Sequence, residues 1–352
     1  MSTTDAPLEI AWFAALCDDD YEQLGVVDER LLSSAEHCGD IMRVADQSGF
    51  DSILLPSGYA LGIDAVTFAA SMASSTHRIR PIVAIRMGEV WLPALARQLA
   101  TLDRLFDGRL IVNVISSEMP GETLNSADRY RRTLEHMIGL RTLLGGERLV
   151  ADGDWLHLGV DPPRITTVSG QCPPLYFGGL SEDARDVAAK QADVYLMWPD
   201  TTDRIGALVS DLRSRAAVYG RSVAFGFRVH VIVRPTEDEA REAARHLIAA
   251  LDPATGEAIR ARSLDSASVG VRAQAALRDE SDGDGYVEAN LWTGIGRARS
   301  GCGAAIVGSP DQVAAKINAY RALGIETFIL SGYPHEDECQ RFAKLVLPLL
   351  SD

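Results

Sequence analysis

The sequence predicts an α/β fold, a (β/α)8 TIM barrel, and two observations predict it. Runs of β-branched and other apolar residues alternate with segments of helical period, and the runs are apolar at nearly every position, as strands buried on both faces must be. No linker of low complexity interrupts the 352 residues, which favours one barrel over two doubly wound domains. We therefore expect residues 1–352 to form a single domain.

Eight runs have the length and composition of buried strands. In chain order they are residues 10–16, 52–55, 79–86, 110–115, 174–178, 193–198, 224–234 and 327–331. Amphipathic helices are expected between them at residues 33–47, 64–75, 91–105, 129–144, 202–219 and 337–350. Further helices begin at the N-cap residue Ser181 and at two capping boxes, Thr236 with Glu239 and Ser309 with Gln312.

Two stretches interrupt this alternation. Residues 145–169 contain Asp152-Gly153-Asp154 followed by a short apolar run, which predicts a small hairpin inserted before the fifth strand. Residues 254–303 are polar and rich in Gly, Asp and Ser. A loop this long in a compact domain is usually functional or disordered, and we expect an active-site lid.

The composition excludes several classes of partner. The chain has 34 Lys and Arg against 49 Asp and Glu, a formal net charge of −15, and no basic run that would bind nucleic acid or an anionic membrane. No apolar run approaches the roughly 18 residues of a membrane span, and residues 1–9 lack the features of a secretory signal. The five cysteines show no CxxC spacing, and the seven histidines form no metal-ligand cluster, so no metal site is expected. We expect a reduced, cytoplasmic protein.

Candidate chemistry lies where the strands end, since TIM-barrel active sites are built at the carboxyl ends of the strands. Trp198 ends the sixth strand, and Tyr333 and His335 follow the eighth. Arg228 and His230 lie two apart in the seventh strand and therefore face the same side. Two potentially cationic groups together favour an anionic ligand over a structural ion pair with an acid.

Two further features allow more than one interpretation. The turn Gly178-Gly179-Leu180-Ser181 lies between a strand and a helix, where backbone N–H groups can bind a phosphate, and Gly308-Ser309-Pro310 has the same chemistry. Arg86 ends the third strand and fits a ligand contact and a rim salt bridge equally well.

Several segments carry a family resemblance. They are ATLDRL (100–105), GRLIVNV (108–114), YFGG (176–179), DVYLMW (193–198), FGFRVHVIVR (225–234), NLWTGIG (290–296) and TFILSGYPH (327–335). In this order, from about Ala11 to Leu350, the chain resembles the FMNH2-dependent alkanesulfonate monooxygenases of the bacterial luciferase-like superfamily.

The resemblance implies a two-component flavin monooxygenase. An NAD(P)H:FMN reductase would supply reduced FMN, and O2 and the flavin would oxidise a small anionic alkanesulfonate to an aldehyde and sulfite. It also implies a homo-oligomer, a dimer or tetramer, and a lid that excludes water from the reaction.

The resemblance also assigns site residues. The catalytic set, which would bind the anion or donate protons, is Arg228, His230, Arg299, Tyr333 and Trp198. The flavin would be held by Ser57, Asn113, Ile115, Ser116, Tyr130, Gly179, Leu180 and Ser181, with Tyr130 and Ser181 at its phosphate. The substrate pocket would include Cys17, Leu61 and His335.

Three loops depart from the family pattern. After the first strand the family has a histidine, where this chain reads Leu16-Cys17-Asp18. After the second strand the family's Cys-Glu-Asp is replaced by Leu61-Gly62-Ile63-Asp64. After the fourth strand its Thr-Gly-Gly is replaced by Ser116-Ser117-Glu118. These changes leave open a superfamily monooxygenase acting on a different small sulfur compound or anion, for example in a biosynthetic pathway. Within the superfamily a deazaflavin-dependent oxidoreductase is a further alternative, whereas the presence of Arg228, His230, Arg299 and Tyr333 opposes a flavin-binding barrel without activity.

Overall fold

Eight parallel strands close into a barrel, which confirms the predicted fold class. The computed structural model describes residues 7–59, 62–261 and 268–350. Around the barrel the strands are β1 (Glu9–Phe13), β2 (Ser52–Leu55), β3 (Arg80–Arg86), β4 (Ile111–Ile115), β7 (Leu175–Gly178), β8 (Val194–Met197), β9 (Ala224–Val233) and β13 (Thr327–Ser331). The barrel closes because β9 pairs with β8 on one side and with β13 on the other, and β13 pairs with β1.

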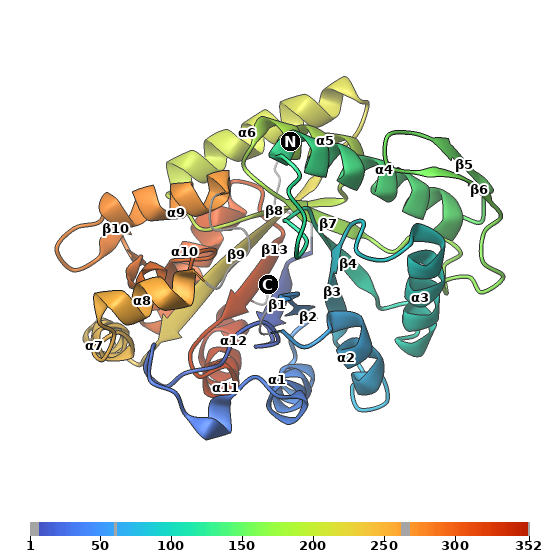
Figure 1. Cartoon of the computed structure of the whole chain (residues 1–352). Helices are drawn as coiled ribbons and strands as arrows, with labels where there is room; N and C mark the ends of the chain where they lie inside the picture. The colour runs from blue at the N-terminus through green and yellow to red at the C-terminus, as the bar shows by residue number, and fades with distance from the viewer. Residues whose placement is uncertain (1–6, 60–61, 262–267, 351–352) are drawn as a thin grey trace.

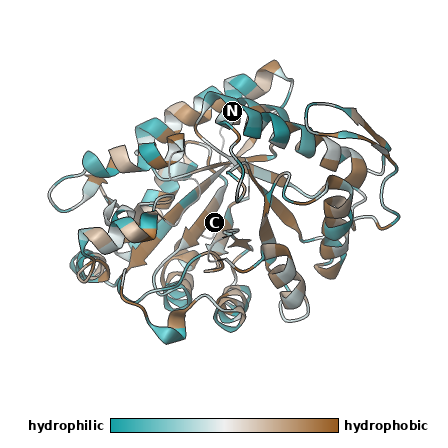
Figure 2. Cartoon of the chain, viewed as in Figure 1, coloured by the Kyte–Doolittle hydropathy of each residue, from teal (hydrophilic) through white to brown (hydrophobic). Residues whose placement is uncertain are grey.

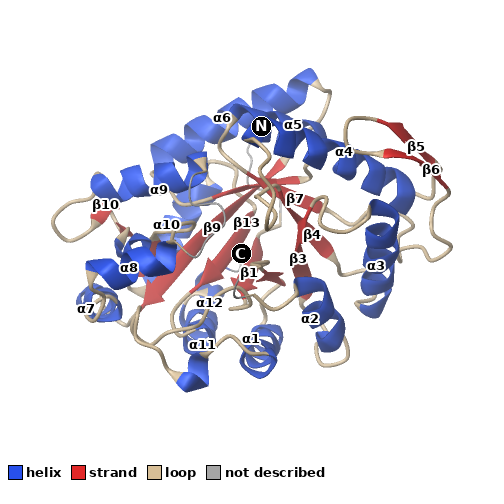
Figure 3. Cartoon of the chain, in the orientation of Figure 1, coloured by secondary structure: helices blue, strands red, loops and turns tan. Residues whose placement is uncertain are grey.

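Helices form a layer outside the strands (Figures 1 and 3). They are α1 (Ala35–Ser48), α2 (Ala65–Met72), α3 (Leu92–Leu105), α4 (Ser126–Leu144), α5 (Glu182–Gln191), α6 (Thr202–Val218), α10 (Pro310–Arg321) and α11 (His335–Leu345), with α7 (Glu237–Leu247) and the short α12 (Leu347–Leu350). Thr236 and Ser309 form the expected capping boxes, and Ser181 caps α5. The single helix expected at 337–350 is wrong: it is divided between α11 and α12 at Val346, two residues before Pro348, which has no N–H to continue the helical ladder.

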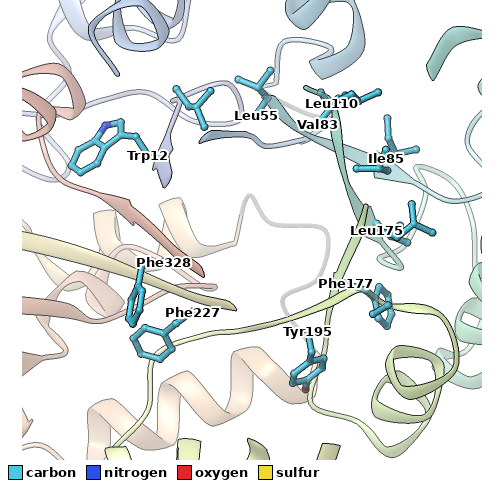
Figure 4. Packing of buried hydrophobic residues seen from close by; sticks show 14 of the residues in the cluster. Trp12, Leu55, Val83, Ile85, Leu110, Leu175, Phe177, Tyr195, Phe227 and Phe328 are labelled. Atoms are coloured by element: carbon cyan, nitrogen blue, oxygen red, sulfur yellow. The ribbon is translucent and has the colours of Figure 1, made fainter. Parts of the chain in front are cut away.

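Alternate strand residues face the two sides of the barrel wall. One buried cluster includes Trp12, Phe177 and Phe328 and fills the space between strands and helices; Figure 4 shows its members distributed around the ring of strands. A smaller cluster, which includes Phe13 and Ile329, has the opposite parity and fills the interior. The hydropathy colouring agrees, with brown strands at the centre and teal on the surrounding helices (Figure 2).

The two inserted stretches lie outside the eight barrel strands. Within 145–169, β5 (Leu149–Asp152) and β6 (His157–Val160) pair antiparallel beside α4, at the edge of the molecule (Figure 1). The second stretch is more ordered than a long loop. It contains α8 (Pro253–Arg260), α9 (Val269–Asp279), β10 (Tyr286–Glu288), β11 (Leu291–Trp292) and the 3-10 turn η2 (Gly294–Arg297).

A strand that the sequence analysis missed joins this insertion to the barrel. β12 (Ala305–Gly308) runs parallel to β9, opposite residues 230–233 and beyond the part of β9 that pairs with β8. β11 pairs antiparallel with β12, and β10 with β11. β9 therefore belongs both to the barrel and to the sheet of the insertion. No helix in the described ranges is long and apolar enough to cross a membrane.

Candidate active site

A cavity of about 340 Å³ opens at the carboxyl ends of the strands. Its wall includes residues that were predicted as catalytic, as flavin-binding and as part of the substrate pocket. They are Cys17, Ser57, Ile115, Trp198, Arg228, His230 and Arg299. The insertion contributes Ile259 of α8, Val271 of α9 and residues 298–302, so it covers the barrel mouth as a lid would. Leu61, which was predicted to line the substrate pocket from the loop after the second strand, lies outside the described residues.

Strand parity explains why these side chains reach the cavity. Arg228 and His230 continue the interior-facing set of β9, and Ile115 continues that of β4. Trp198 follows β8 with the same parity as Val194, whose side chain lies in the interior cluster. The apolar interior therefore changes to a polar site near the ends of the strands.

Arg228 is a buried cation with no carboxylate partner among the described residues. Its side chain donates to Ser331 Oγ at 2.8 Å and to the Val229 carbonyl at 3.0 Å, and its guanidinium lies 4.4 Å from the centre of the Phe13 ring. Burial lowers the pKa of Arg228 from its ordinary value, yet a guanidinium stays protonated in proteins. A buried charge needs a compensating one, so the geometry favours an anionic ligand here.

His230 is neutral in this environment. Burial, together with the positive charge of Arg228, lowers its pKa well below the ordinary value. Its Nδ1 lies 2.7 Å from Ser331 Oγ, and it also forms a hydrogen bond with the backbone of Cys302. Arg228 can only donate to Ser331 Oγ, whereas the direction of the hydrogen bond between Ser331 and His230 depends on the tautomer of the imidazole.

Arg299 reaches the cavity from the insertion and forms an ion pair with Asp18 of the loop after β1. Burial opposes its charge, but Tyr333 and Asp18 outweigh this effect and raise its pKa above the ordinary value. The ion pair therefore joins the insertion to the barrel.

Tyr333 and His335 do not line the cavity wall. Tyr333 stacks on His230 with ring centres 5.3 Å apart, and burial raises the pKa of its phenol. Its hydroxyl is buried without a hydrogen-bond partner among the described residues. His335, predicted in the substrate pocket, contacts Tyr333 edge-on at 5.0 Å instead.

Asp20, which the sequence analysis missed, holds His335 in place. The carboxylate accepts from His335 Nδ1 at 2.7 Å and from the His335 backbone N–H at 2.8 Å, and His37 Nε2 lies 3.1 Å away on its other side. Burial alone would raise the pKa of Asp20, but the contacts with both histidines hold it well below its usual range. Nε2 of His335 is buried without a partner in the described part of the chain.

The Gly-Gly turn forms a cradle beside Tyr130. Gly179 has φ +148°, and a Cβ on it would lie 2.7 Å from Ala184 Cβ and 3.1 Å from Tyr130 Oη. Ser181 accepts from the Ala184 N–H at 3.2 Å, and Tyr195 donates to the Gly179 carbonyl at 2.6 Å. Tyr130 and Ser181, which the resemblance places at the flavin phosphate, thus lie with Gly179 and Leu180 at the N-terminus of α5, where hydroxyls and backbone N–H groups could bind an anion.

The alternative turn is already filled by its own side chains. The Ser309 N–H donates to Gln312 Oε1 at 2.9 Å, and a Cβ on Gly308 would lie 2.9 Å from the same oxygen. The remaining flavin candidates lie at the end of β4 near the cavity. Asn113 faces the interior, and Ser116 shares a hydrogen bond of 2.7 Å with Thr133.

Arg86 lies on the cavity wall, where the sequence left two interpretations. Its Nε donates to Ser117 Oγ at 3.0 Å, and its Nη1 lies 3.3 Å from Glu89 Oε2 at the more exposed rim. The rim salt bridge is therefore present, and the ligand contact of Arg86 stays a prediction. Ser117 and Asp18 also line the wall, and both lie in loops where the sequence departs from the family pattern.

Comparisons with known proteins agree with this geometry. Residues 10–327 match the family model of the luciferase-like monooxygenases. The chain is 59% identical over 347 residues to a sulfoquinovose monooxygenase of Novosphingobium aromaticivorans, covering 97% of this chain and 96% of that protein. It is 49% identical over 343 residues to a sulfoquinovose monooxygenase of Agrobacterium fabrum, covering 97% and 89%. The crystal structure of riboflavin lyase with modified FMN and riboflavin has the same fold, with a TM-score of 0.79 at 17% identity over 98% of this chain and 91% of that one.

Proposed function

The chain belongs to the luciferase-like monooxygenase family, and on that premise we propose that it uses reduced FMN and O2 to desulfonate sulfoquinovose. The observation that carries the proposal is Arg228, a cation on the cavity wall that is 6% exposed and has no carboxylate partner among the described residues. A sulfonate is a permanent anion and supplies the missing charge. The similarity to two sulfoquinovose monooxygenases supports the sugar.

This substrate refines the expected alkanesulfonate. The sulfur of sulfoquinovose is attached to a CH2 group outside the sugar ring, so the bond to be cleaved is the same as in an alkanesulfonate. The difference is the hydroxylated ring in place of an alkyl chain. In the balanced reaction, R–CH2–SO3⁻, O2 and reduced FMN give R–CHO, HSO3⁻, water and oxidised FMN.

The residues of the Gly-Gly cradle fit a flavin phosphate. Tyr130 and Ser181 would hold it, with Gly179 and Leu180 contributing backbone, while Ser57, Asn113, Ile115 and Ser116 would lie along the ring system. When bound, reduced FMN supplies two electrons and activates O2. A separate NAD(P)H:FMN reductase would renew it.

The protein itself binds, orients and shields the substrate. Arg228 would hold the sulfonate, and the buried hydroxyl of Ser331, which is also hydrogen-bonded to His230, fixes the guanidinium. Trp198 and Val271 of α9 provide apolar wall that keeps water from the oxidising flavin.

The test is a sulfite-release assay with the purified chain, an NAD(P)H:FMN reductase, FMN and O2. We expect sulfite from sulfoquinovose, at a kcat/KM above that for hexanesulfonate, and none when the reductase is omitted. No sulfite from sulfoquinovose in the complete mixture would overturn the proposal. Replacing reduced FMN with reduced deazaflavin tests the alternative cofactor, which would have to bind more tightly than FMN.

A further inference from the structure

Asp20 is a buried carboxylate that has no role in the proposed reaction so far. It is 1% exposed, and each of its oxygens accepts two hydrogen bonds. Oδ1 accepts from the Tyr21 N–H at 2.9 Å and from His335 Nδ1 at 2.7 Å. Oδ2 accepts from the His335 N–H at 2.8 Å and from His37 Nε2 at 3.1 Å. The four acceptor positions of a carboxylate are therefore all used.

These contacts fix the orientation of the His335 ring. Burial raises the pKa of Asp20, but the contacts with His335 and His37 outweigh this effect and hold it well below its usual range. An ionised carboxylate only accepts hydrogen bonds, so Nδ1 of His335 carries a proton whether the imidazole is neutral or charged. A carboxylate that holds one imidazole nitrogen in this way leaves the other nitrogen available for proton exchange.

The available nitrogen, Nε2 of His335, has no structural partner in the described ranges, and neither has the buried hydroxyl of Tyr333. The two rings are in contact, edge-on at 89° with their centres 5.0 Å apart. Two unpartnered polar atoms on contacting buried side chains can satisfy each other, after a small rotation of one ring or through one bridging water molecule. The geometry therefore pairs Nε2 with the phenol.

The phenol of Tyr333 lies close to the anion site. Its ring stacks on His230, which lines the cavity, with ring centres 5.3 Å apart. Burial raises the pKa of the phenol, and the positive charges of Arg299 and Arg228 oppose this effect. The hydroxyl is thus within electrostatic range of both cations on the cavity wall, and His335 stands behind it.

We infer that Asp20 is a positioning residue for the desulfonation, which holds His335 so that Nε2 meets the Tyr333 hydroxyl. The inference rests on the proposed function, in which the carbon bonded to sulfur gives up one hydrogen as it becomes an aldehyde. A group near the sulfonate then has to hold or move a proton. A neutral imidazole accepts the hydroxyl proton and an imidazolium donates to the hydroxyl oxygen, so the pair can hold one proton beside the anion in either state.

The kinetic experiment measures kcat and KM for sulfoquinovose at saturating reduced FMN in the wild type and in Asp20→Ala. We expect kcat to fall at least about tenfold, because the imidazole is no longer held. KM should stay within about threefold, since neither Asp20 nor His335 is part of the described cavity wall. Asp20→Asn keeps the shape of the side chain with one acceptor oxygen in place of two. It is the second variant if the alanine variant does not fold.

Asp46→Ala is the matched control. Asp46 is also a buried carboxylate, 8% exposed, and it accepts from three backbone N–H groups, those of His77, Arg78 and Ile79. Its contacts join α1 to the segment before β3. The control should lower the melting temperature, as Asp20→Ala does, and keep kcat within about twofold of wild type.

Nitrogen-15 NMR of histidine-labelled protein tests the geometry without turnover. The signals that are absent from His335→Gln belong to His335. We expect its Nδ1 to be protonated in the wild type, and in Asp20→Ala the proton should be free to occupy Nε2 instead.

The outcomes separate the two proposals. If the wild type releases sulfite from sulfoquinovose and folded Asp20 variants keep its kcat, the role of Asp20 is wrong and the proposed function stands. The same holds if Asp46→Ala lowers kcat as much, or if the Asp20 variants change only KM, because loss of packing then explains the effect. An unprotonated Nδ1 in wild-type His335 overturns the inference independently of the kinetics. If the wild type releases no sulfite, the proposed function fails and the inference falls with it.

Discussion

Ser331 and His230 lie opposite each other on β13 and β9, and their side chains meet at 2.7 Å between Oγ and Nδ1. The pairing follows from the parallel register, which brings both residues to the same interior face. Because the same hydroxyl accepts from Arg228 at 2.8 Å, one serine holds the guanidinium and is also hydrogen-bonded to the imidazole. Arg228 and His230, which were predicted, and Ser331, which was not, thus form one hydrogen-bonded unit.

Replacing Ser331 with Ala should weaken catalysis without removing any charge. The change leaves a buried donor of Arg228 and Nδ1 of His230 unpaired, and one unsatisfied buried group costs about 1–3 kcal/mol. We expect kcat/KM for the sulfonate to fall about tenfold, mostly through KM, since the orientation of Arg228 is lost. Ser71→Ala removes a hydroxyl that only bonds its own helix and should leave the kinetics unchanged. If Ser331→Ala and Ser71→Ala had the same kinetics, the hydrogen-bonded unit of Arg228, Ser331 and His230 would be contradicted.

Removing the cation itself should have a larger effect. Arg228→Ala should lower kcat/KM by a factor that corresponds to about 2–4 kcal/mol, the usual loss for a charge-assisted contact to a buried anion. Affinity for reduced FMN should stay within about threefold of wild type, because Arg228 is not among the residues predicted to hold the flavin. Fluorescence titration with FMN and the sulfite assay measure the two quantities. Arg245→Ala, on the exposed face of α7, is the control; an unchanged kcat/KM in Arg228→Ala would refute the anion site.

A substitution in the Gly-Gly cradle should weaken the binding of reduced FMN and leave the binding of the sulfonate nearly unchanged. Gly179→Ala adds a Cβ 3.1 Å from Tyr130 Oη at φ +148° and should raise the Kd for reduced FMN about tenfold or more, while KM for the sulfonate at saturating flavin changes little. Gly146→Ala is matched, since it also has positive φ, +81°, but nothing lies within 4 Å of the new Cβ. If both variants bind flavin like the wild type, the phosphate is bound elsewhere.

Stability should depend on pH through His230. Its pKa is lowered well below the ordinary value in the folded state, so below about pH 6.5 the unfolded chain binds a proton that the folded chain does not. Stability therefore falls with decreasing pH, by about 1.4 kcal/mol per unit for this residue. Urea unfolding at two pH values, about 5.5 and 8, should show a smaller difference in His230→Asn than in the wild type. His157→Asn replaces an exposed histidine on β6 and should show the same pH dependence of stability as the wild type. If His230→Asn also keeps the wild-type pH dependence, the role assigned to His230 is wrong.

The barrel could be predicted because its strands are mostly apolar runs, interrupted in β9 by Arg228 and His230. β12 has the same signature, Ala-Ile-Val-Gly, but eight runs already complete a barrel and its role outside the ring has no local signal. The insertion was expected as a loop because Gly, Asp and Ser dominate it. Helices form there nonetheless, since Asp252 caps α8 and Ser268 caps α9.

The site residues divide in the same way. Arg228, His230 and Trp198 could be predicted, because polar or bulky residues at strand ends are unusual and strand parity gives their direction. Asp20 could not, because its partner His335 lies 315 residues away and only the closed barrel brings the loop after β1 against α11. Asp18 follows the predicted Cys17 directly, but its charge gave no reason to place it near an anion.

The shared strand β9 also suggests how the protein can be re-engineered. The residues that close the barrel, 224–230, and those that carry β12, 230–233, follow each other along one strand and meet at His230. The segment from α8 to β12 can therefore be exchanged between relatives as a cassette while barrel closure is preserved. The joints to keep are the four-residue register of Ala305–Gly308 against β9 and the Arg299 contact to Asp18.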